Sequence, residues 1–410
     1  MHAAPELAAG IASLPSAGTA FAATQGAWRF LNNEAVTLPA LVEPLRQVGR
    51  PRAEASSAKF VLLAHDWCKL SYDQAKRKRD LVQLTHATDV GYELTTALLI
   101  SADDGDPLAP MEMHLKTARG VLSTRSHVRD VHHLEQVLPT MKASLTWGLT
   151  KPIVHVIDRE ADSVDGYRRW AAAGHKFVVR GDDRRVKWGE KSCLLSVIRD
   201  ELRRHKKFRK AGEALYHGRR ENLWVAEVEV VLYRPAKKSA GGRKFERAGR
   251  PLTLRLIVVQ VRNDKGKVLA DWLLLSNVPL DWATTEHLAR CYYWRWRIES
   301  FFKLLKSHGQ QLERWQQATG PAIARRLLIA AMACVVVWQL QADDSSAAVE
   351  FKNVLIRLSG RQMKRSRPHT APALLAGLWV LLSTLALLEH CCDLRHLKRL
   401  VAKIPYLSSA

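Results

Sequence analysis

Short hydrophobic runs separated by polar stretches predict several β-strands between residues 58 and 184. These runs have the length and spacing of strands, and the longer stretches between them have helical periodicity. The predicted strands are Phe60–Ala64, Tyr92–Ile100, Met111–Lys116, Lys151–Ile157 and Lys176–Arg180, and the predicted helices are Ser126–Leu145 and a segment that ends at Trp170. Gly105–Pro107 has the composition of a turn between the second and third strands. Consecutive strands followed by a strand–helix–strand unit predict a mixed α/β sheet.

Beyond residue 184 the chain becomes strongly basic and its hydrophobic pattern changes. Trp224–Tyr233 and Leu252–Val261 alternate as strands do, and the basic stretch Ala236–Arg250 between them is predicted to be a loop. Residues 185–284 therefore form a predicted β-rich insertion in the α/β domain. Helical periodicity resumes after this insertion and continues to the end of the chain, interrupted by the basic turn Arg361–His369.

The segment Tyr292–Lys306 (YYWRWRIESFFKLLK) has two chemically different faces when it is drawn as a helix. A single arc about 80° wide carries the polar side chains Tyr292, Arg295, Glu299, Lys303 and Lys306. The opposite side carries Trp294, Ile298, Phe301 and Leu305. A carboxylate among cations can hold a divalent metal beside a phosphate, as a site that cuts phosphodiester bonds requires. An ordinary amphipathic helix with solvated charges has the same pattern.

Two further acids follow hydrophobic strands. Asp66 comes after the run that begins at Phe60, and Asp158 lies in the stretch VHVIDREAD. Carboxylates at the C-terminal ends of adjacent strands converge above the sheet, where they repel each other and a divalent cation relieves the repulsion. Either acid alone is equally typical of a helix N-cap or a turn. Asp162, a short way into the following helix, is predicted to have a surface role.

The charge of the chain indicates an acidic partner. Lys and Arg number 63 against 40 Asp and Glu, which gives a net charge of +23 and a pI near 10.0. A protein this basic repels itself unless a polyanion binds it, so nucleic acid is the leading prediction and a membrane surface the competing one. The basic runs Lys76–Arg79 and Arg203–Lys210 are either phosphate contacts or solvated charge. His132, His133 and Glu135 have the residue types of a metal site, but a solvated helix face is the preferred interpretation.

Two apolar runs raise the question of a membrane span. Leu327–Leu340 is too short to cross a bilayer. Ala371–Leu388 contains a proline and polar residues, so this second run is predicted to be a core or dimer-forming helix. The N-terminus lacks the pattern of a signal peptide, and the predicted location is cytoplasmic with no membrane partner. The six cysteines show no C-x-x-C pair, which is typical of reduced thiols. No phosphate-binding loop motif occurs, so ATP use is not indicated.

The order of motifs resembles the DDE transposases of the bacterial insertion-sequence-four family. That family carries a Tyr, Arg, Glu and Lys signature with two, three and six residues between successive members, and the matching residues here are Tyr292, Arg295, Glu299 and Lys306. Further segments match in order: GAWRFLNN, the strand before Asp66, DREAD, FVVRG at Phe177–Gly181 and WLLLSNVP at Trp272–Pro279. The resemblance therefore covers nearly the whole chain.

The resemblance implies an RNase H-like core in which Asp66, Asp158 and Glu299 hold two Mg²⁺ or Mn²⁺ ions. It implies that the protein binds double-stranded DNA at transposon ends and targets, acts as a homodimer on that DNA, and excises the element through hairpin ends. The residues that it implies for phosphate contacts are Tyr292, Arg295, Lys303, Lys306 and Arg180. Trp272 matches the tryptophan that receives a flipped base, although a tryptophan at a strand start is otherwise usually a core residue.

The implied organisation has parts with different roles. They are a shortened N-terminal DNA-end-binding segment (1–57), the first part of the RNase H-like core (58–184), the β-rich insertion (185–284), the core segment with the signature helix (285–342) and a C-terminal helical dimerisation region (343–410). The stretch before GAWRF is short and Ala-rich, so poor discrimination of transposon ends is expected. Trp67 and Cys68 stand where many relatives have threonines, so the hydroxyl contacts near the metal are not carried over.

The alternative function is a catalytically idle or N-terminally truncated DNA-binding or dimerising inhibitor of transposition. The shortened N-terminal segment favours this alternative, whereas the intact acids Asp66, Asp158 and Glu299 favour an active transposase. A protein that only binds DNA has no need of three acids that converge on one point.

Overall fold

The computed structural model describes residues 20–72, 77–86, 88–240, 243–306, 309–363 and 369–391, together with Arg395 and Arg399. Most of its strands join one large sheet: β1 (Val61–Ser71), β2 (Val82–Gln83), β3 (Val90–Ile100), β4 (Pro107–Thr117), β5 (Gly120–Ser123), β6 (Ile153–Ile157), β7 (Lys176–Arg180), β8 (Arg185–Trp188), β9 (Lys191–Leu194), β10 (Arg209–Tyr216), β11 (Arg219–Leu232), β14 (Leu252–Arg262) and β15 (Val268–Ser276). The hairpin β12 (Ala236–Ala240) and β13 (Arg243–Arg247) forms a second, small sheet.

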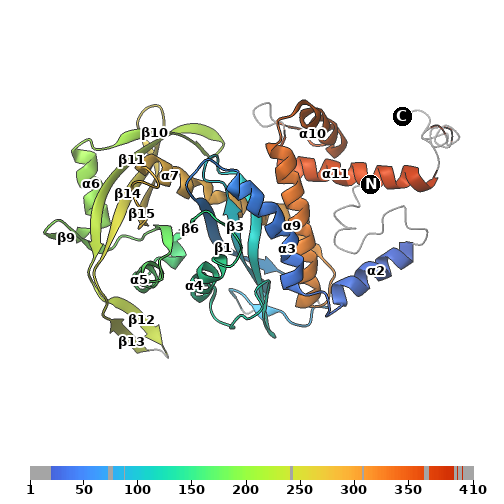
Figure 1. Ribbon diagram of the computed structural model, residues 1–410, viewed down its shortest axis with the longest axis horizontal. Coiled ribbons are helices and arrows are strands. Elements are labelled where there is room, and N and C mark those ends of the chain that lie inside the picture. Colours follow the sequence, from blue (N-terminus) through green and yellow to red (C-terminus); the bar gives the residue numbers. More distant parts are fainter. Residues whose placement is uncertain are drawn as a thin grey trace.

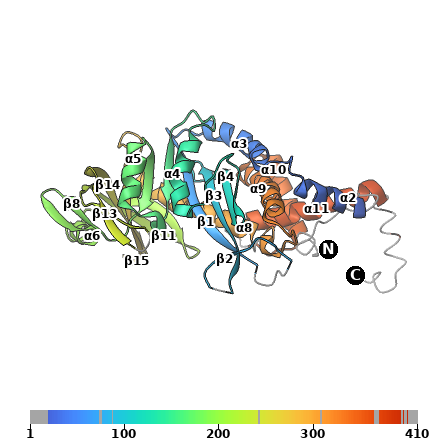
Figure 2. The same cartoon turned by 90° about the horizontal axis from the view of Figure 1, so that it is seen from below.

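Helices flank the large sheet and build one end of the molecule (Figure 1). They are α2 (Ala20–Asn32), α3 (Leu38–Glu54), α4 (His133–Ser144), α5 (Val164–Ala172), α6 (Leu195–Arg204), α7 (Thr285–Trp294), α8 (Trp296–Leu305), α9 (Gly320–Ala342), α10 (Ser346–Ser359) and α11 (Ala371–Cys391), with the short 3-10 helices η1 (Arg159–Ala161) and η2 (Leu312–Arg314). Figure 2 shows α4 and α5 on the same side of the sheet. The helices α9, α10 and α11 lie at the opposite end from the strands of residues 185–284.

The strand order confirms the predicted mixed α/β sheet. Along the sheet it is β5-β4-β3-β1-β6-β7-β15-β14-β11-β8-β9, with β10 paired to β11 and β2 to β3. The strand β1 is antiparallel to β3 but parallel to β6, and β6 is parallel to β7. The strand β15 then pairs antiparallel with β7, so the strands of residues 185–284 extend the same sheet. The insertion therefore shares its backbone hydrogen-bond network with the α/β part. The limits of the five predicted parts of the chain stay predictions.

The two faces of β7 belong to different parts of the core. Val178 is buried in the cluster that includes residues of α7, α8 and α9, whereas Phe177 and Val179 are buried in the cluster that includes residues of α4, α5 and α6. Successive side chains of a strand point to opposite faces, so helices must cover both faces to bury all three residues. Both faces of the central sheet are therefore buried, as parallel strands require.

The first predicted strand is longer than expected. The strand β1 runs on from the hydrophobic run to Ser71, because its antiparallel pairing with β3 continues to the pair Ser71 and Gly91. Asp66 therefore lies inside β1, opposite Thr96, and not after its end as predicted. The parallel pairing of β1 with β6 does stop at His65 and Ile157, so Asp66 is the first residue beyond that pairing.

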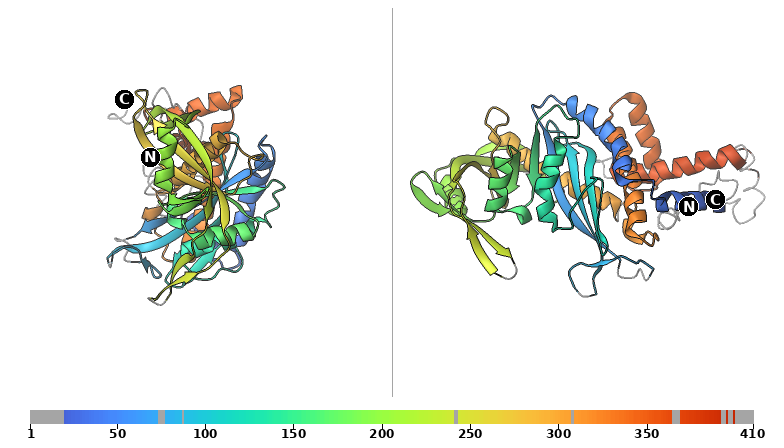
Figure 3. Two further views of the ribbon diagram at one scale, coloured as in Figure 1. Left: turned by 90° about the vertical axis from the view of Figure 1, so that its left-hand side faces the viewer. Right: turned by 60° about the horizontal axis from the view of Figure 1, so that its bottom comes forward.

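Two other predictions need correction. The helix predicted from Ser126 begins only at His133, because the His132 side chain accepts a hydrogen bond from the Leu134 N–H and caps the helix there. The stretch predicted to be a loop, Ala236–Arg250, contains the hairpin β12–β13, which projects from the body of the protein (Figure 3). Its sequence has a Gly-Gly pair between two short runs, which is a hairpin signal that the prediction did not use.

The signature segment is two helices and not one. The helices α7 and α8 meet at Arg295, which has helical backbone angles but donates its N–H to the Tyr292 carbonyl three residues earlier. The predicted apolar side is confirmed, because Trp294, Ile298, Phe301 and Leu305 are all buried. The polar side differs from a solvated face, since Tyr292 and Arg295 are each only 5% exposed.

The first apolar run lies in a helix that is longer than the run itself. The helix α9 has 23 residues and is long and apolar enough to cross a membrane, but 67% of its most apolar window is buried inside the protein. Its N-terminus is held by Asp80, whose carboxylate oxygens lie 2.8 and 3.1 Å from the Gly320 nitrogen. A negative charge at a helix N-terminus interacts favourably with the helix dipole. The run Leu327–Leu340 was predicted to be too short to span a membrane, but the helix that contains it is long enough, and its burial is typical of a core helix.

Three buried histidines lie on or beside the central strands, His65 in β1, His155 in β6 and His175 just before β7. The His65 Nε2 and His155 Nδ1 atoms are 2.9 Å apart, and the ring of His175 contacts that of His155 at 5.4 Å between centroids. Burial lowers the pKa of His65 to about 4 and the pKa of His155 well below its usual value. Both imidazoles are therefore neutral near pH 7.

These neutral histidines are expected to make the fold sensitive to mild acid. Between pH 6.5 and 4 the unfolded chain binds protons that the folded His65 and His155 do not, so the free energy of unfolding falls as the pH falls. At about 1.4 kcal/mol per pH unit, His65 alone contributes a loss of about 2 kcal/mol between pH 6.5 and 5. Urea denaturation at pH 7.5, 6 and 5 measures this loss. A His155→Phe variant should show a weaker dependence of the free energy of unfolding on pH. The exposed control His86→Gln should keep the wild-type dependence. The same change of unfolding free energy with pH in all three proteins would contradict the prediction.

Candidate active site

The structure brings the three predicted acids to one place. Asp66 and Asp158 are the residues that follow the last β1–β6 pair, His65 and Ile157, so they stand side by side where the parallel pairing of the two strands ends. The helix α8 packs against β1 and β3, and this packing brings Glu299 to the same edge. Acids that are 92 and 141 residues apart in the sequence thus meet at one edge of the sheet.

A single guanidinium lies among the three carboxylates. The Arg295 Nη1 atom donates to Asp66 Oδ2 at 2.8 Å, and the Nη2 atom donates to Glu299 Oε1 at 2.8 Å. The same Nη2 lies 3.7 Å from Asp158 Oδ2, within ion-pair distance. Arg295 stands at the junction of α7 and α8, and its side chain is buried. Its pKa is raised, because the acids and Tyr292 outweigh the effect of burial.

The three carboxylates carry more negative charge than this guanidinium neutralises. Burial, opposed by Arg295, leaves the pKa values of Asp66 and Glu299 above their usual range. Burial also raises the pKa of Asp158, but Arg295, the Arg159 N–H and Tyr292 lower it further, so its net shift is downward. Three acids that share one cation form a site that attracts further positive charge.

Tyr292 and Arg180 complete the surroundings of Asp158. The Tyr292 hydroxyl donates to Asp158 Oδ1 at 2.9 Å, and burial raises the pKa of this phenol. Arg180, the last residue of β7, is close enough to lower the pKa values of both Asp158 and Tyr292. Trp272 of β15 is half-buried, and its ring lies 5.7 Å from the Tyr292 ring. Arg180 therefore lies within electrostatic reach of Asp158, and Trp272 contacts Tyr292.

An open pocket of ≈ 560 Å³ exposes the acids to solvent. It is lined by Asp66, Trp67, Cys68, Asp158, Glu299, Phe302, Lys303, Lys306 and Glu313. Lys306 donates to the Lys69 carbonyl at 2.7 Å and pairs with Glu313 at 3.0 Å, so its ammonium is held in place. Lys303 is exposed, with its ammonium 5.5 Å from the centre of the Trp296 ring. The pocket thus contains both acids and lysines, as a site for metal and phosphate requires.

The sequence profile of the family described as "Transposase DDE domain" matches residues 64–336, two thirds of the chain. The chain belongs to the DDE transposase family. The match begins two residues before Asp66 and includes Asp158 and Glu299.

Two other likenesses are weaker. A gluconokinase of Gluconobacter oxydans (strain 621H) is 29% identical over 136 residues, which are 33% of this chain and 70% of the gluconokinase. The piggyBac transposase, in its synaptic complex with hairpin DNA, is 11% identical, with a TM-score of 0.35 over 83% of this chain and 56% of its own. The alignment with the present chain thus covers about half the length of the piggyBac chain. At this TM-score the likeness defines no common fold.

A divalent ion fits the chemistry of the acid cluster. Carboxylate oxygens are the ligands that Mg²⁺ and Mn²⁺ prefer, and the surplus negative charge around Arg295 favours a cation. Across the described part of the transposase, no group of three or more Asp, Glu, His or Cys side chains is spaced to enclose an ion, and the Arg295 guanidinium lies among the three acids. If an ion binds here, the residues that would hold it are the three converging acids, Asp66, Asp158 and Glu299.

The sequence did not single out two acids near the site. Glu313 of η2 accepts a hydrogen bond from the Ser71 N–H at 3.0 Å and pairs with Lys306, and its proximity depends on a contact between distant segments. Glu160 lies in the DREAD motif, and membership of this motif was the only sequence pattern that indicated a role for it.

Asp162 was predicted to lie at the surface, but its side chain is buried. It pairs with Arg184 and accepts a hydrogen bond from the Asp182 N–H at 2.7 Å. It braces the loop after β7 and does not face the acids.

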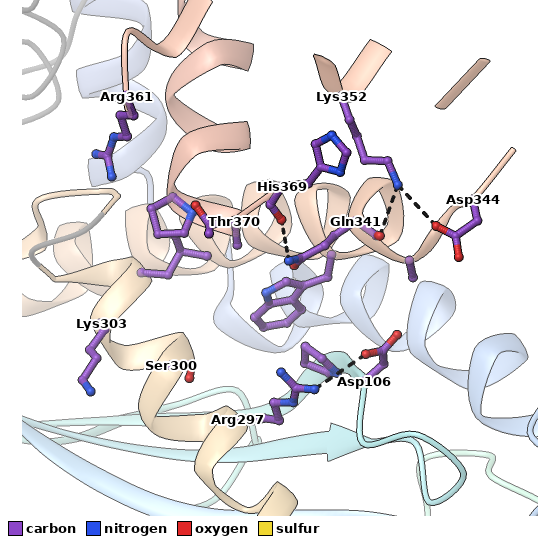
Figure 4. A pocket seen from close by; sticks show the side chains of 16 residues that line it. Asp106, Arg297, Ser300, Lys303, Gln341, Asp344, Lys352, Arg361, His369 and Thr370 are labelled. Carbon is purple, nitrogen blue, oxygen red and sulfur yellow. Dashed lines mark hydrogen bonds and ion pairs between the residues drawn. The ribbon is translucent and has the colours of Figure 1, made fainter. Parts of the chain in front are cut away.

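A second pocket lies beside α8, on the side of the C-terminal helices (Figure 4). Its volume is ≈ 760 Å³, and Lys303 lines both pockets. Its charges are largely paired: Arg297 lies 3.9 Å from Asp106, and the buried Lys352 pairs with Asp344 at 3.6 Å and donates to the Asp343 carbonyl at 2.6 Å. The acid-lined pocket is therefore the better candidate for catalysis.

Proposed function

We propose that this transposase cleaves DNA and transfers strands in a metal-dependent, cut-and-paste reaction of the insertion-sequence-four type. The observation that carries the proposal is the convergence of Asp66, Asp158 and Glu299 on one guanidinium in a pocket that also contains lysines. A DNA-binding inhibitor without catalysis has no need of this arrangement. The mixed sheet, with the antiparallel pair β1–β3 beside the parallel pairs β1–β6 and β6–β7, supports an RNase H-like core.

The proposed cofactors are two Mg²⁺ or Mn²⁺ ions. Such ions activate the attacking oxygen and stabilise the leaving oxygen in phosphodiester chemistry. The side chains of the transposase would supply the rest of the site. Tyr292 fixes the orientation of Asp158 through its hydroxyl, and Glu313 fixes the position of Lys306. Lys303, which has no such anchor among the described residues, can move to a phosphate at the DNA end.

The proposed partners are double-stranded DNA, at the transposon ends and at the target, and a second copy of the chain. The net charge of +23 supplies the sequence-independent attraction to DNA. The helix α11 buries Leu374 and Leu375 but leaves Trp379, Leu382 and Leu385 between 37% and 49% exposed. These exposed apolar side chains support pairing of two copies through α11.

The direct test is cleavage of DNA that carries the inverted repeats flanking the gene. The purified protein is expected to nick and then join such ends with Mg²⁺ or Mn²⁺, and to do neither in EDTA. A scrambled end at the same salt concentration serves as the control for specificity. Tight DNA binding without any metal-dependent nicking would favour the alternative, an idle or truncated inhibitor of transposition.

Trp272 is proposed to hold a flipped base during hairpin formation. Trp272→Ala is expected to slow hairpin closure by about five- to a hundredfold, the equivalent of the roughly 1–3 kcal/mol that one stacked base contributes. First-strand nicking should change little, because it needs only the acids and phosphate contacts. Rapid-quench assays of the two steps measure the difference. The control is Trp224→Ala, since Trp224 is also half-buried in the insertion sheet but packs on Arg262. Equal slowing of both steps by Trp272→Ala would indicate a core role.

A further inference from the structure

A buried histidine lies between two acids just outside the candidate active site. His133, the first residue of α4, is 7% exposed. Its Nε2 atom is 3.1 Å from Glu160 Oε1, and its Nδ1 atom is 3.0 Å from Glu93 Oε1, an ion-pair contact without hydrogen-bond geometry. Glu93 comes from β3 and Glu160 from η1, so the imidazole joins three separate elements.

Trp67 binds the same group of residues. Its indole Nε1 donates to Glu160 Oε2 at 3.0 Å, while His133 takes the other oxygen of that carboxylate. The Trp67 ring also stacks on the His133 ring, with 4.1 Å between centroids and 26° between planes. The ring of His132 contacts His133 at 3.9 Å. Trp67, His133 and Glu160 thus form a closed set of mutual contacts, which we call the His133 clamp.

The His133 clamp connects the two chain segments that carry Asp66 and Asp158. Trp67 is the residue after Asp66, and Glu160 lies two residues after Asp158. The backbone pairing of β1 with β6 ends just before both acids, so no sheet hydrogen bond between these strands fixes their separation. Arg295 joins the two acids through its guanidinium, whereas the bond from Trp67 to Glu160 joins the two segments directly, and His133 contacts both of its ends.

We propose that Trp67, His133 and Glu160 are positioning residues that hold Asp66 and Asp158 at the separation at which they bind divalent ions. The inference rests on the proposed function and assigns it a support in which Trp67 and His133 lie outside the signature motifs. Two carboxylates side by side repel each other, and a segment free to move would let them separate. Groups that orient metal ligands typically change metal affinity or activity by about 10–100-fold when they are removed.

The test compares His133→Phe, Glu160→Ala and the double variant with the wild-type protein. Phenylalanine keeps a flat ring against Trp67 but removes both polar contacts of the imidazole. Each single variant is expected to need about 10–100-fold more Mg²⁺ for half-maximal nicking, with DNA affinity unchanged and the rate recovering at high Mg²⁺. The double variant should be no worse than the more impaired single variant, because both changes break one unit. Glu160→Gln, which keeps an oxygen for Trp67, should be less affected than Glu160→Ala.

The matched control is Glu135→Gln, which changes an exposed acid in the first turn of the same helix. It should leave the Mg²⁺ requirement unchanged. A second readout that does not depend on catalysis is the rise in Tm on adding Mn²⁺, which should be smaller in the variants than in the wild type. If the wild type never cleaves DNA, the proposed function fails, and the Mn²⁺-dependent Tm still compares the variants. An unchanged Mg²⁺ requirement and an unchanged Mn²⁺ shift in His133→Phe and Glu160→Ala would overturn the positioning role.

Discussion

Alanine at Asp66, Asp158 or Glu299 is expected to abolish metal-dependent cleavage of a transposon end while leaving non-specific DNA binding intact. The three carboxylates converge on the same pocket, and loss of any one removes a third of the proposed metal ligands. A loss of about 4 kcal/mol in transition-state stabilisation corresponds to about a thousandfold in rate, so nicking should fall to background. Affinity comes from the basic surface and should stay the same or increase slightly.

Gel-based nicking and fluorescence anisotropy on the same end DNA measure the two properties separately. Glu350→Ala is a suitable control, because Glu350 is an exposed acid on α10 and its loss changes the net charge by the same amount. Near-normal Mg²⁺-dependent nicking by any one of the three active-site variants would falsify the assignment of that acid. A parallel loss of DNA binding would instead indicate that the substitution damages the fold.

Arg295→Ala is expected to destabilise the metal-free protein by about 3 kcal/mol, the low end of the range for breaking a buried ion pair. The guanidinium is 5% exposed and contacts three acids, so its removal leaves carboxylates that repel each other at the sheet edge. The expected loss is at the low end because the side chains of Asp158 and Glu299 remain 36% and 27% exposed. Adding Mn²⁺ should recover part of the stability, because a divalent ion relieves the same repulsion.

Urea denaturation in EDTA and in Mn²⁺ measures both effects. Arg297→Ala is the matched control from the same helix, since Arg297 is half-exposed and lies 3.9 Å from Asp106; its loss should cost less than about 1 kcal/mol. Arg295→Lys should lie between alanine and wild type, because lysine keeps the charge but cannot bind two carboxylates with one planar fork. A stability in EDTA that is equal for Arg295→Ala and wild type would show that the guanidinium does not hold the acids together.

The sequence predicted much of the site because its strongest signals are local. Helical periodicity alone placed Arg295 and Glu299 on one face, and the structure joins them by a hydrogen bond four residues apart. The hydrophobic run before Asp158 predicted where β6 ends, and the parallel pairing with β1 then placed Asp66 beside it. The mixed sheet followed from the order of strand and helix patterns.

Contacts between segments that are distant in the chain could not be predicted from the sequence. The burial of Arg295 depends on Asp66, 229 residues away, and no periodicity indicates that a polar helix face will be covered. The continuation of β1 through Asp66 depends on its antiparallel partner β3, which a hydrophobic run by itself does not reveal. The His133 clamp joins β1, η1 and α4, so no local pattern in the sequence connected its three members.

By itself the sequence determined the approximate positions of most central strands, the basic charge, the order of the motifs and the residue types of the site, because these depend on local spacing and composition. The tertiary structure alone decided that one guanidinium lies among three acids, that Trp272 stands beside Tyr292, and that the insertion strands continue the central sheet. Packing decides such features because it brings distant side chains together in a low-dielectric interior. Charged groups buried there must then be neutralised by a partner of opposite charge.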